Sequence, residues 1–388
     1  MSVTETAPAA SAERIQLGLE PSSRLISLDA FRGITIAGMI LVNDPGTWGA
    51  IYEPLEHADW HGWTPTDLVF PFFLFIVGVA ITFTYRKRLA RGDARGKLVS
   101  KAVRRTLVLI ALGLLLSAIP FTTDFSQLRF PGVLQRIAVC YLAGTVLFLF
   151  TTSRTQTIVG GALLLGYWML MTLVPVPGYG AGLIDQPEST LAAHIDRVVF
   201  GPGHLWEGAD RMWDPEGILS TLPAIVTVLL GIWAGHMLQR DQPASERVAR
   251  MLAWGFVLII AGYVWDWFFP INKKIWTSSY TLFTAGLAMS ALALCYRVID
   301  ILGHRRWAQP FVVFGMNAIG IYVVAGVVAT LLYTIPVGGR SLHEAIYQNV
   351  FAPIGSPQFS SMLFALAFVG AMYLVAWAMY RRRIFLKV

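Results

Sequence analysis

About ten apolar segments, each close to 20 residues long, constrain this 388-residue chain more than any other feature. A helix needs about 20 apolar residues to cross the hydrocarbon core of a bilayer. Backbone polar groups in lipid must be satisfied within the segment, so each segment is predicted to be a helix. Charged residues make up only 14% of the chain. The sequence therefore predicts an all-α, polytopic transmembrane helical bundle, with spans near residues 25–43, 65–85, 104–120, 132–151, 156–174, 217–238, 250–269, 279–297, 310–332 and 359–380.

The basic residues are sorted between the two sides of the membrane. With the N-terminus in the cytosol, 22 of the 30 Lys and Arg residues fall in cytosolic segments and six in the opposite loops. The positive-inside rule then places both termini in the cytosol. The net charge of +7 is read as this topology signal and not as nucleic-acid binding. Residues 1–23 are predicted to be a disordered cytosolic tail, and residues 24–388 a single transmembrane domain.

The stretch from His57 to Gly78 places titratable groups directly before an apolar run. Thr64, Pro65 and Asp67 are typical of a helix start: an N-cap, a proline at the first helical position, and a carboxylate that can reach back to the cap amide. His57 therefore belongs to the loop 44–64, which faces the periplasm or an organelle lumen.

His57 and Asn43 are the preferred reactive pair. Asn43 ends the first span and His57 shortly precedes the second, so a short loop could bring them together. A neutral imidazole can accept a proton from an amine, and an amide can orient it or hold an oxyanion. His61 and Asp59 could join His57 around a metal, but this spacing matches no strong zinc motif and no metal is expected.

Several spans carry polar groups, which are costly at membrane depth and usually face a shared cavity. Asp29 and Arg32 lie three apart in the first span. They form either a self-satisfied ion pair or, with Arg24, a site for the phosphates of an anionic ligand. The cluster from Arg86 to Arg105 is interpreted mainly as a topology signal. Further polar groups within the spans are Gln135, Arg136, Asn317 and Tyr322.

The long non-cytosolic loops supply candidates for sugar binding. Asp214 and Pro215 look like the cap and first position of the sixth span. An aromatic and cationic rim on this face would suit a sugar. The candidate substrate contacts are Trp60, His61, Asp67, His204, Glu216, Asn272, Lys273 and Tyr280.

An ordered set of motifs resembles the heparan-alpha-glucosaminide N-acetyltransferase family, including its bacterial NagX-like members. The motifs are R-L-I-S-L-D-A-F-R-G ending at Gly33, V-N at Asn43, H-A-D-W-H-G-W-T-P-T-D-L-V-F-P from His57, P-G-V-L-Q-R from Pro131, I-D-R from Ile195, D-P-E-G-I-L from Asp214, I-N-K-K-I-W-T-S-S-Y from Ile271 and F-G-M-N from Phe314. The resemblance covers about residues 24–330.

The resemblance implies a transmembrane acetyltransferase that takes acetyl-CoA from the cytosol and acetylates an amino sugar on the far side. It assigns the catalytic histidine to His57 and the first-helix asparagine to Asn43. The chain differs from lysosomal members at His61 and in having no large luminal domain before the first span, which favours a small bacterial amino sugar or cell-wall fragment over heparan. The predicted acetyl-CoA contacts are Arg32, Arg24, Asp29, Gln135, Arg136 and Asn317.

The predicted activity is acetyl-CoA-dependent N-acetylation of a glucosamine-type sugar at the bacterial inner membrane. His57 either deprotonates the amine or briefly carries the acetyl group. An amino-sugar permease and a membrane O-acyltransferase acting on a polysaccharide stay open as alternatives. The partners are the sugar, acetyl-CoA and the bilayer, without nucleic acid; a homodimer is left open.

Overall fold

The computed structural model describes residues 25–121 and 124–386. The predicted tail 1–23 and the candidate Arg24 lie outside the described residues. The long helices are α2 (Ile26–Asn43), α3 (Val69–Ala90), α4 (Arg95–Ala118), α5 (Val133–Phe150), α6 (Ser153–Leu173), α8 (Thr221–Leu238), α9 (Ala244–Asp266), α10 (Ser278–Cys295), α12 (Ala318–Thr334) and α14 (Pro357–Arg381).

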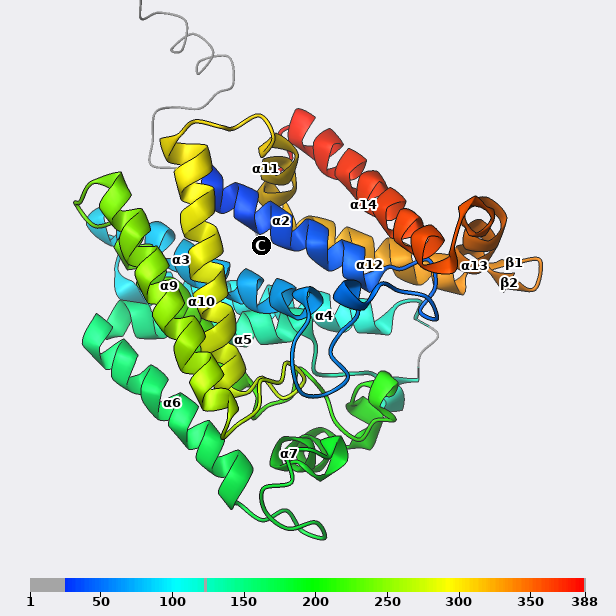
Figure 1. Cartoon of the computed structure of the whole chain (residues 1–388), viewed down its shortest axis with the longest axis horizontal. Helices are drawn as coiled ribbons and strands as arrows, with labels where there is room; N and C mark the ends of the chain where they lie inside the picture. The colour runs from blue at the N-terminus through cyan, green and yellow to red at the C-terminus, as the bar shows by residue number, and fades with distance from the viewer. Residues whose placement is uncertain (1–24, 122–123, 387–388) are drawn as a thin grey trace, which may run out of the picture.

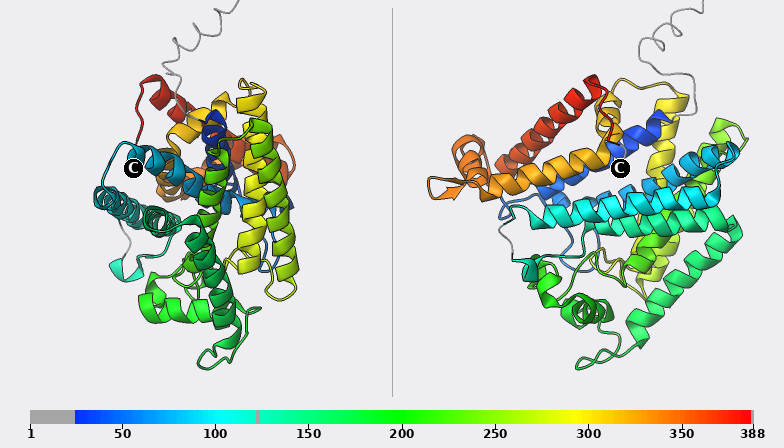
Figure 2. Two further views of the ribbon diagram at one scale, coloured as in Figure 1. Left: turned by 90° about the vertical axis from the view of Figure 1, so that its left-hand side faces the viewer. Right: turned by 180° about the vertical axis from the view of Figure 1, so that it is seen from behind.

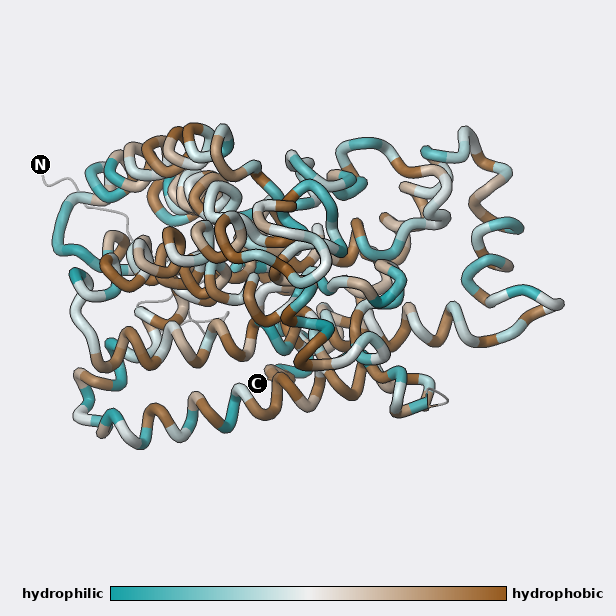
Figure 3. The backbone as a smooth tube through the Cα atoms, turned by 90° about the horizontal axis from the view of Figure 1, so that it is seen from below, coloured by the Kyte–Doolittle hydropathy of each residue, from teal (hydrophilic) through white to brown (hydrophobic). Residues whose placement is uncertain are grey.

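The shorter elements are α7 (Leu191–Phe200), α11 (Gln309–Met316), α13 (Leu342–Ile346) and the two-stranded hairpin β1 (Pro336–Val337) and β2 (Arg340–Ser341). A π-helical turn, η7 (Tyr296–Ile301), extends α10, and the 3₁₀ turn η2 (Pro65–Leu68) leads into α3. The predicted all-α bundle is confirmed. Figure 3 shows the apolar residues running along the helices and hydrophilic residues concentrated in the connections.

Eight helices of the described chain are long and apolar enough to cross a membrane, and the bent pair α11 and α12 adds a ninth. The predicted span 104–120 corresponds to α4, which is long enough but begins with five cations (Arg95, Lys97, Lys101, Arg104 and Arg105) and so falls outside that number. These cations define what we call the basic face of the bundle, where α3 ends and α4 begins.

The predicted single helix over 310–332 is wrong in one respect, because the chain bends by 83° between α11 and α12. The bend falls at Asn317, which is buried. Its amide donates to the Ile384 carbonyl at 2.9 Å and accepts the Leu386 N–H at 2.9 Å. Asn317 therefore ties the break in the helix to the C-terminal segment, a contact that no local pattern could predict.

Two glycine pairs allow central helices to approach closely. A Cβ on Gly33 of α2 would lie 1.7 Å from the Phe311 carbonyl oxygen, and one on Gly315 of α11 would lie 1.9 Å from that of Asp29. Gly78 of α3 and Gly231 of α8 face each other in the same way. Only glycine permits these backbone contacts, which fix α2 against α11 and α3 against α8.

The helices around the site are held from several directions. α2 packs against α3, α10, α11, α12 and α14, and α4 packs along α5. Figure 2 shows α4 and α5 running side by side, with α12 and α14 on the adjoining face. The start of α2 is capped from a distance, because the Asp300 carboxylate accepts the Ile26 and Ser27 N–H groups at 3.3 and 3.0 Å.

Candidate functional site

The loop that carries His57 meets the turn between α9 and α10 at the end of the bundle opposite the basic face. The Gly62 N–H donates to the Ile271 carbonyl at 2.7 Å, and Gly62 forms a parallel bridge with Asn272. Figure 1 shows these two connections converging beside the loops around α7. Segments about 200 residues apart in sequence therefore form one surface.

His57 is oriented by Asp67. The His57 Nδ1 atom lies 2.6 Å from Asp67 Oδ1, while Asp67 Oδ2 accepts the N–H groups of Ala58 at 3.1 Å and Thr64 at 3.0 Å. The predicted cap of Thr64 by Asp67 is thus confirmed, and the same carboxylate also holds the imidazole. Because a buried carboxylate accepts, the ring donates its Nδ1–H and presents the Nε2 lone pair.

Lys273 also contacts this imidazole. Its Nζ atom lies 3.1 Å from His57 Nε2, 3.2 Å from His57 Nδ1 and 4.0 Å from Asp67 Oδ1. Burial lowers the pKa of Lys273, although the charges of Asp67 and Glu216 oppose the effect. The three side chains therefore form a compact Asp, His and Lys cluster, and the His57 side chain is 38% exposed.

The remaining outer candidates lie around this cluster, mostly in structural contacts. Trp60 donates its indole N–H to the Ile184 carbonyl at 2.8 Å, and His61 pairs with Asp185 at 2.7 Å. His57 and His61 thus have different carboxylate partners. The buried Asn272 side chain accepts the Ile275 N–H at 3.1 Å.

Two further candidates are tied to the backbone. The buried Tyr280 hydroxyl donates to the Asp67 carbonyl at 2.5 Å, directly beneath the cluster. His204 lies in the loop after α7, where its Nδ1 atom contacts the Leu128 carbonyl at 2.7 Å and its ring stacks on Phe130. The bonds of both polar atoms are therefore to backbone carbonyls and not to His57.

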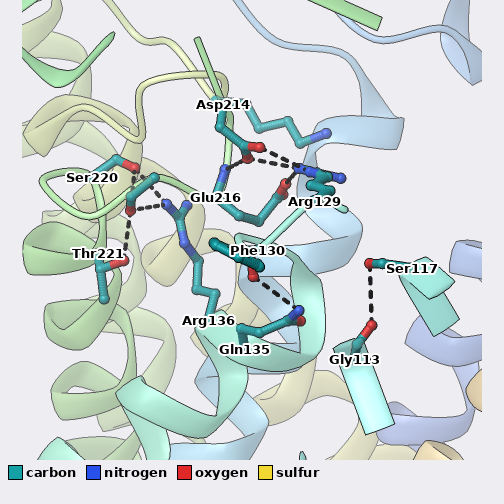
Figure 4. A network of polar contacts seen from close by, with 12 residues as sticks. Gly113, Ser117, Arg129, Phe130, Gln135, Arg136, Asp214, Glu216, Ser220 and Thr221 are labelled. Atoms are coloured by element: carbon teal, nitrogen blue, oxygen red, sulfur yellow. Dashed lines mark hydrogen bonds and ion pairs between the residues drawn. The ribbon is translucent and has the colours of Figure 1, made fainter. Parts of the chain in front are cut away.

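A second charged cluster joins the loop before α5 to the loop before α8 (Figure 4). Arg129 binds Asp214 through two bonds of 2.8 and 2.7 Å and Glu216 through one of 2.6 Å. Burial lowers the pKa of Arg129, but its two carboxylate partners outweigh this effect and raise it. Burial raises the pKa of Glu216, but the positive charges of Arg129, Arg136 and Lys273 outweigh this effect and lower it. The predicted cap role of Asp214 is wrong for α8, which begins only at Thr221; Asp214 binds Arg129 and also accepts the Glu216 N–H at 2.9 Å, which caps no more than a turn before the helix.

Arg136 and Asp196 are buried behind this cluster. The Arg136 guanidinium donates to the Gly217 carbonyl at 3.0 Å and to the Ser220 hydroxyl, and lies over the Trp276 ring. Burial raises the pKa of Asp196 to about 7. Both residues therefore support the loop before α8 from inside the protein.

A cavity of about 810 Å³ opens near the basic face between α2, α3, α4, α5 and the α11–α12 bend. Its lining on α3 runs from Arg88 to Phe73, a rise of about 22 Å along the helix. Phe73 lies only about two helical turns beyond Asp67. The cations on its wall are Arg32, Arg88, Lys101, Arg104 and Arg105.

The predicted donor contacts divide between this cavity and other places. Arg32 bonds Asp29 at 3.2 Å and the Gly315 carbonyl at 3.3 Å, so the ion pair is formed. Arg32 also lines the cavity, where its binding of a ligand phosphate stays a prediction. Gln135 lies outside the lining and donates to the Phe130 carbonyl at 3.1 Å (Figure 4). Arg136 and Asn317 also lie outside it, since Arg136 holds the loop before α8 and Asn317 holds the C-terminal segment.

Asn43 lines a smaller pocket of about 240 Å³ at the far end of α2, between α4 and α12. Asp44, Ser117, Tyr322 and Thr330 share this pocket. His57 is not among its lining residues, and the side chains bonded to its ring are those of Asp67 and Lys273. The structure therefore places the two residues of the predicted reactive pair in neighbouring but different surroundings.

Fold and site together define a polytopic helical membrane protein with a basic cavity on one side and a histidine cluster on the other. A family model described as "Heparan-alpha-glucosaminide N-acetyltransferase, catalytic" matches residues 24–263. The chain belongs to this family, so the predicted family is confirmed and the family is one of N-acetyltransferases.

Two curated relatives share the similarity over nearly the whole chain. The human heparan-alpha-glucosaminide N-acetyltransferase is 30% identical over 94% of this chain, and the mouse protein of the same name is 28% identical over 95%. The chain spans about 60% of the length of these relatives.

Sequence reasoning missed the cavity cations on α3 and α4. Lys101, Arg104 and Arg105, with Val108, follow the i, i+3, i+4, i+7 spacing of one helical face, and that periodicity was the available signal. Asp67 was identified as a cap, but its bond to His57 depends on the loop's path. Arg129 had no local signal, because its partners lie about 85 residues away.

Proposed function

We propose that this chain is a transmembrane acetyltransferase that takes acetyl-CoA from the basic face and acetylates the amine of a glucosamine-type sugar at the opposite face. The observation that carries the proposal is the basic cavity, whose lining continues along α3 toward Asp67 and His57. Membership of an N-acetyltransferase family supplies the reaction class.

The cavity chemistry suits coenzyme A. Its phosphates need positive charge, and Arg binds phosphate through two parallel bonds. Among the described residues no partner is recorded for Arg88, Lys101 or Arg104, so their donors are available to a ligand. The deeper wall, with Phe73, Val77, Ile81, Leu109 and Ile137, is apolar and suits the pantetheine arm.

The distribution of charge supports the proposed orientation. The excess of Lys and Arg on the basic face is what the positive-inside rule expects of the cytosolic side, where acetyl-CoA is made, and we propose that the His57 loop lies on the periplasmic side of a bacterial inner membrane. The cavity lining covers about 22 Å of a hydrocarbon core of about 30 Å. An acetyl-CoA molecule bound at the cytosolic mouth could therefore extend through most of the thickness of the membrane within this cavity.

At the far end His57 supplies the reacting nitrogen. With Nδ1–H held by Asp67, the Nε2 lone pair either accepts a proton from the attacking amine or attacks the acetyl carbon itself. In the first course the amine nitrogen bonds the acetyl carbon as the C–S bond breaks, and the thiolate takes up a proton. In the second the acetyl group passes from sulfur to Nε2 and then to the amine. Lys273 must move from Nε2 in either course.

The test uses purified protein in vesicles with its basic face outward. Labelled acetyl-CoA is added outside the vesicles, and glucosamine is enclosed inside them. The expected result is N-acetylglucosamine within the vesicles for wild type and for the control His304→Ala, an exposed histidine outside both sites, but no product for His57→Ala. Transfer that survives His57→Ala would remove His57 from the mechanism. Product formation on hydroxyl groups alone would replace the amine acceptor with an O-acyl acceptor.

A further inference from the structure

We propose that the pocket between α2, α4 and α12 binds the protonated primary amine of the acceptor, with Asp44 as its counter-ion. The identity of the acceptor rests on the proposed function, but the affinity for a primary ammonium does not. The site is distinct from the His57, Asp67 and Lys273 cluster.

The pocket has the size and polarity of a site for part of a sugar. Its volume of about 240 Å³ is below that of pockets for drug-sized ligands, roughly 300–1,000 Å³. Polar groups reach it from three helices: Asn43 and Asp44 from the end of α2, Ser117 from α4, and Tyr322 and Thr330 from α12.

Hydrogen-bond accounting shows which kind of ligand these groups select. The Ser117 hydroxyl donates to the Gly113 carbonyl at 3.2 Å, and the Thr330 hydroxyl donates to the Gly326 carbonyl at 2.9 Å. Each hydroxyl has one proton, so both oxygens face the pocket as acceptors. Together with the Asp44 carboxylate they favour a ligand rich in N–H and O–H donors, and they disfavour an anion.

Asp44 is the charge in this pocket without a protein counter-ion. In the described part of the chain no cation lies within 4 Å of its carboxylate, and no hydrogen bond to its side chain is recorded. Burial raises the pKa of Asp44 to about 7. A carboxylate in this position is stabilised by any ammonium group that enters the pocket.

The other charges near the pocket also favour a cation. The Tyr322 hydroxyl lies within electrostatic range of Asp44, Glu216 and Arg129. Arg129 is already bound to two carboxylates, Asp214 and Glu216, so this cluster adds no free positive charge. Arg136 and Lys273 act on Glu216 from behind it. Among the described residues, the pocket lining therefore carries the Asp44 carboxylate and no cation, and its side-chain donors are the neutral Asn43 amide and Tyr322 hydroxyl.

The proton balance of N-acetylation fixes what such a site can do. A primary ammonium must lose two protons to become a neutral amide, so the bound ammonium is not itself the nucleophile. The sugar passes from the pocket to the His57 cluster and loses the first proton to water. There the nitrogen bonds the acetyl carbon as the bond from that carbon to sulfur, or to the His57 nitrogen, breaks; the second proton goes to the group that departs, through Nε2 where His57 acts as the base.

The experiment measures binding without acetyl-CoA, so it does not depend on transfer. Isothermal titration of the full chain in lipid nanodiscs compares glucosamine with glucose, which replaces the ammonium with a hydroxyl. Wild type should prefer glucosamine by at least tenfold at pH 7.5, and the preference should fall as the pH is lowered to 5.5 and Asp44 takes up a proton.

Asp44→Asn should remove this preference, while Glu53→Gln, an exposed carboxylate on the same loop, should keep it. His57→Ala should also keep it, since His57 is not part of the pocket. The variants are compared only after their melting temperatures match that of wild type. An unchanged preference in Asp44→Asn, or no preference in wild type, overturns the inference. Failure of wild type to transfer acetyl groups overturns the proposed function instead.

Discussion

Replacing Arg104 by Gln should weaken acetyl-CoA binding about tenfold. Arg104 lies on the face of α4 that lines the basic cavity, and no partner within the described chain competes for its guanidinium. A hydrogen bond to a charged group is worth about 1.5–3 kcal/mol. Arg104 is exposed, so solvent screening brings the expected loss to the lower end, about 1.4 kcal/mol, which is tenfold in Kd.

The measurement is the Kd of acetyl-CoA in nanodiscs at 50 and 300 mM salt. Because the Debye length shortens as salt rises, the difference between Arg104→Gln and wild type should shrink at high salt. Arg91→Gln is the matched control: it removes the same charge from the turn between α3 and α4, outside the cavity lining. Equal losses in both variants, or no loss in Arg104→Gln, would refute the assignment of this cavity to the donor.

Three further outcomes are expected. Asp67→Asn should lower the rate of acetyl transfer by about 10²-fold with little change in the KM for acetyl-CoA, because His57 loses the acceptor that orients it; steady-state kinetics decides. Lys273→Met should raise the rate of acetyl transfer at pH 7, because it removes the group that must leave Nε2 before that nitrogen can react; an unchanged or lower rate contradicts this. Asp196→Asn should raise the melting temperature at pH 8 more than at pH 5. The pKa of Asp196 is about 7 in the folded protein, against 3.8 for an unburied carboxyl. In wild type the folded state therefore loses up to about 4 kcal/mol of stability as the pH rises from 3.8 to 7 and the buried carboxyl has to ionise.

Local rules recovered the elements whose causes are local. The Thr64, Pro65 and Asp67 start of the second span follows from atoms within four residues of one another, and the structure confirms it. The same rules failed at Asp214: its carboxylate accepts the Glu216 N–H as a cap would, but the chain forms only a turn there and α8 begins at Thr221. The half-buried Arg129 binds the same carboxylate through two bonds, a tertiary contact that no local pattern shows.

The sequence by itself determined the helical membrane class, the family, and the residue types that can carry acyl transfer. Those conclusions need only composition, segment length and ordered motifs. The tertiary structure alone decided that His57 contacts both Asp67 and Lys273, that the cations of α3 and α4 share one cavity, and that Asn43 faces a separate pocket. These facts depend on which helices approach one another, and close approach is set by contacts such as Gly33 against Phe311, nearly 280 residues apart.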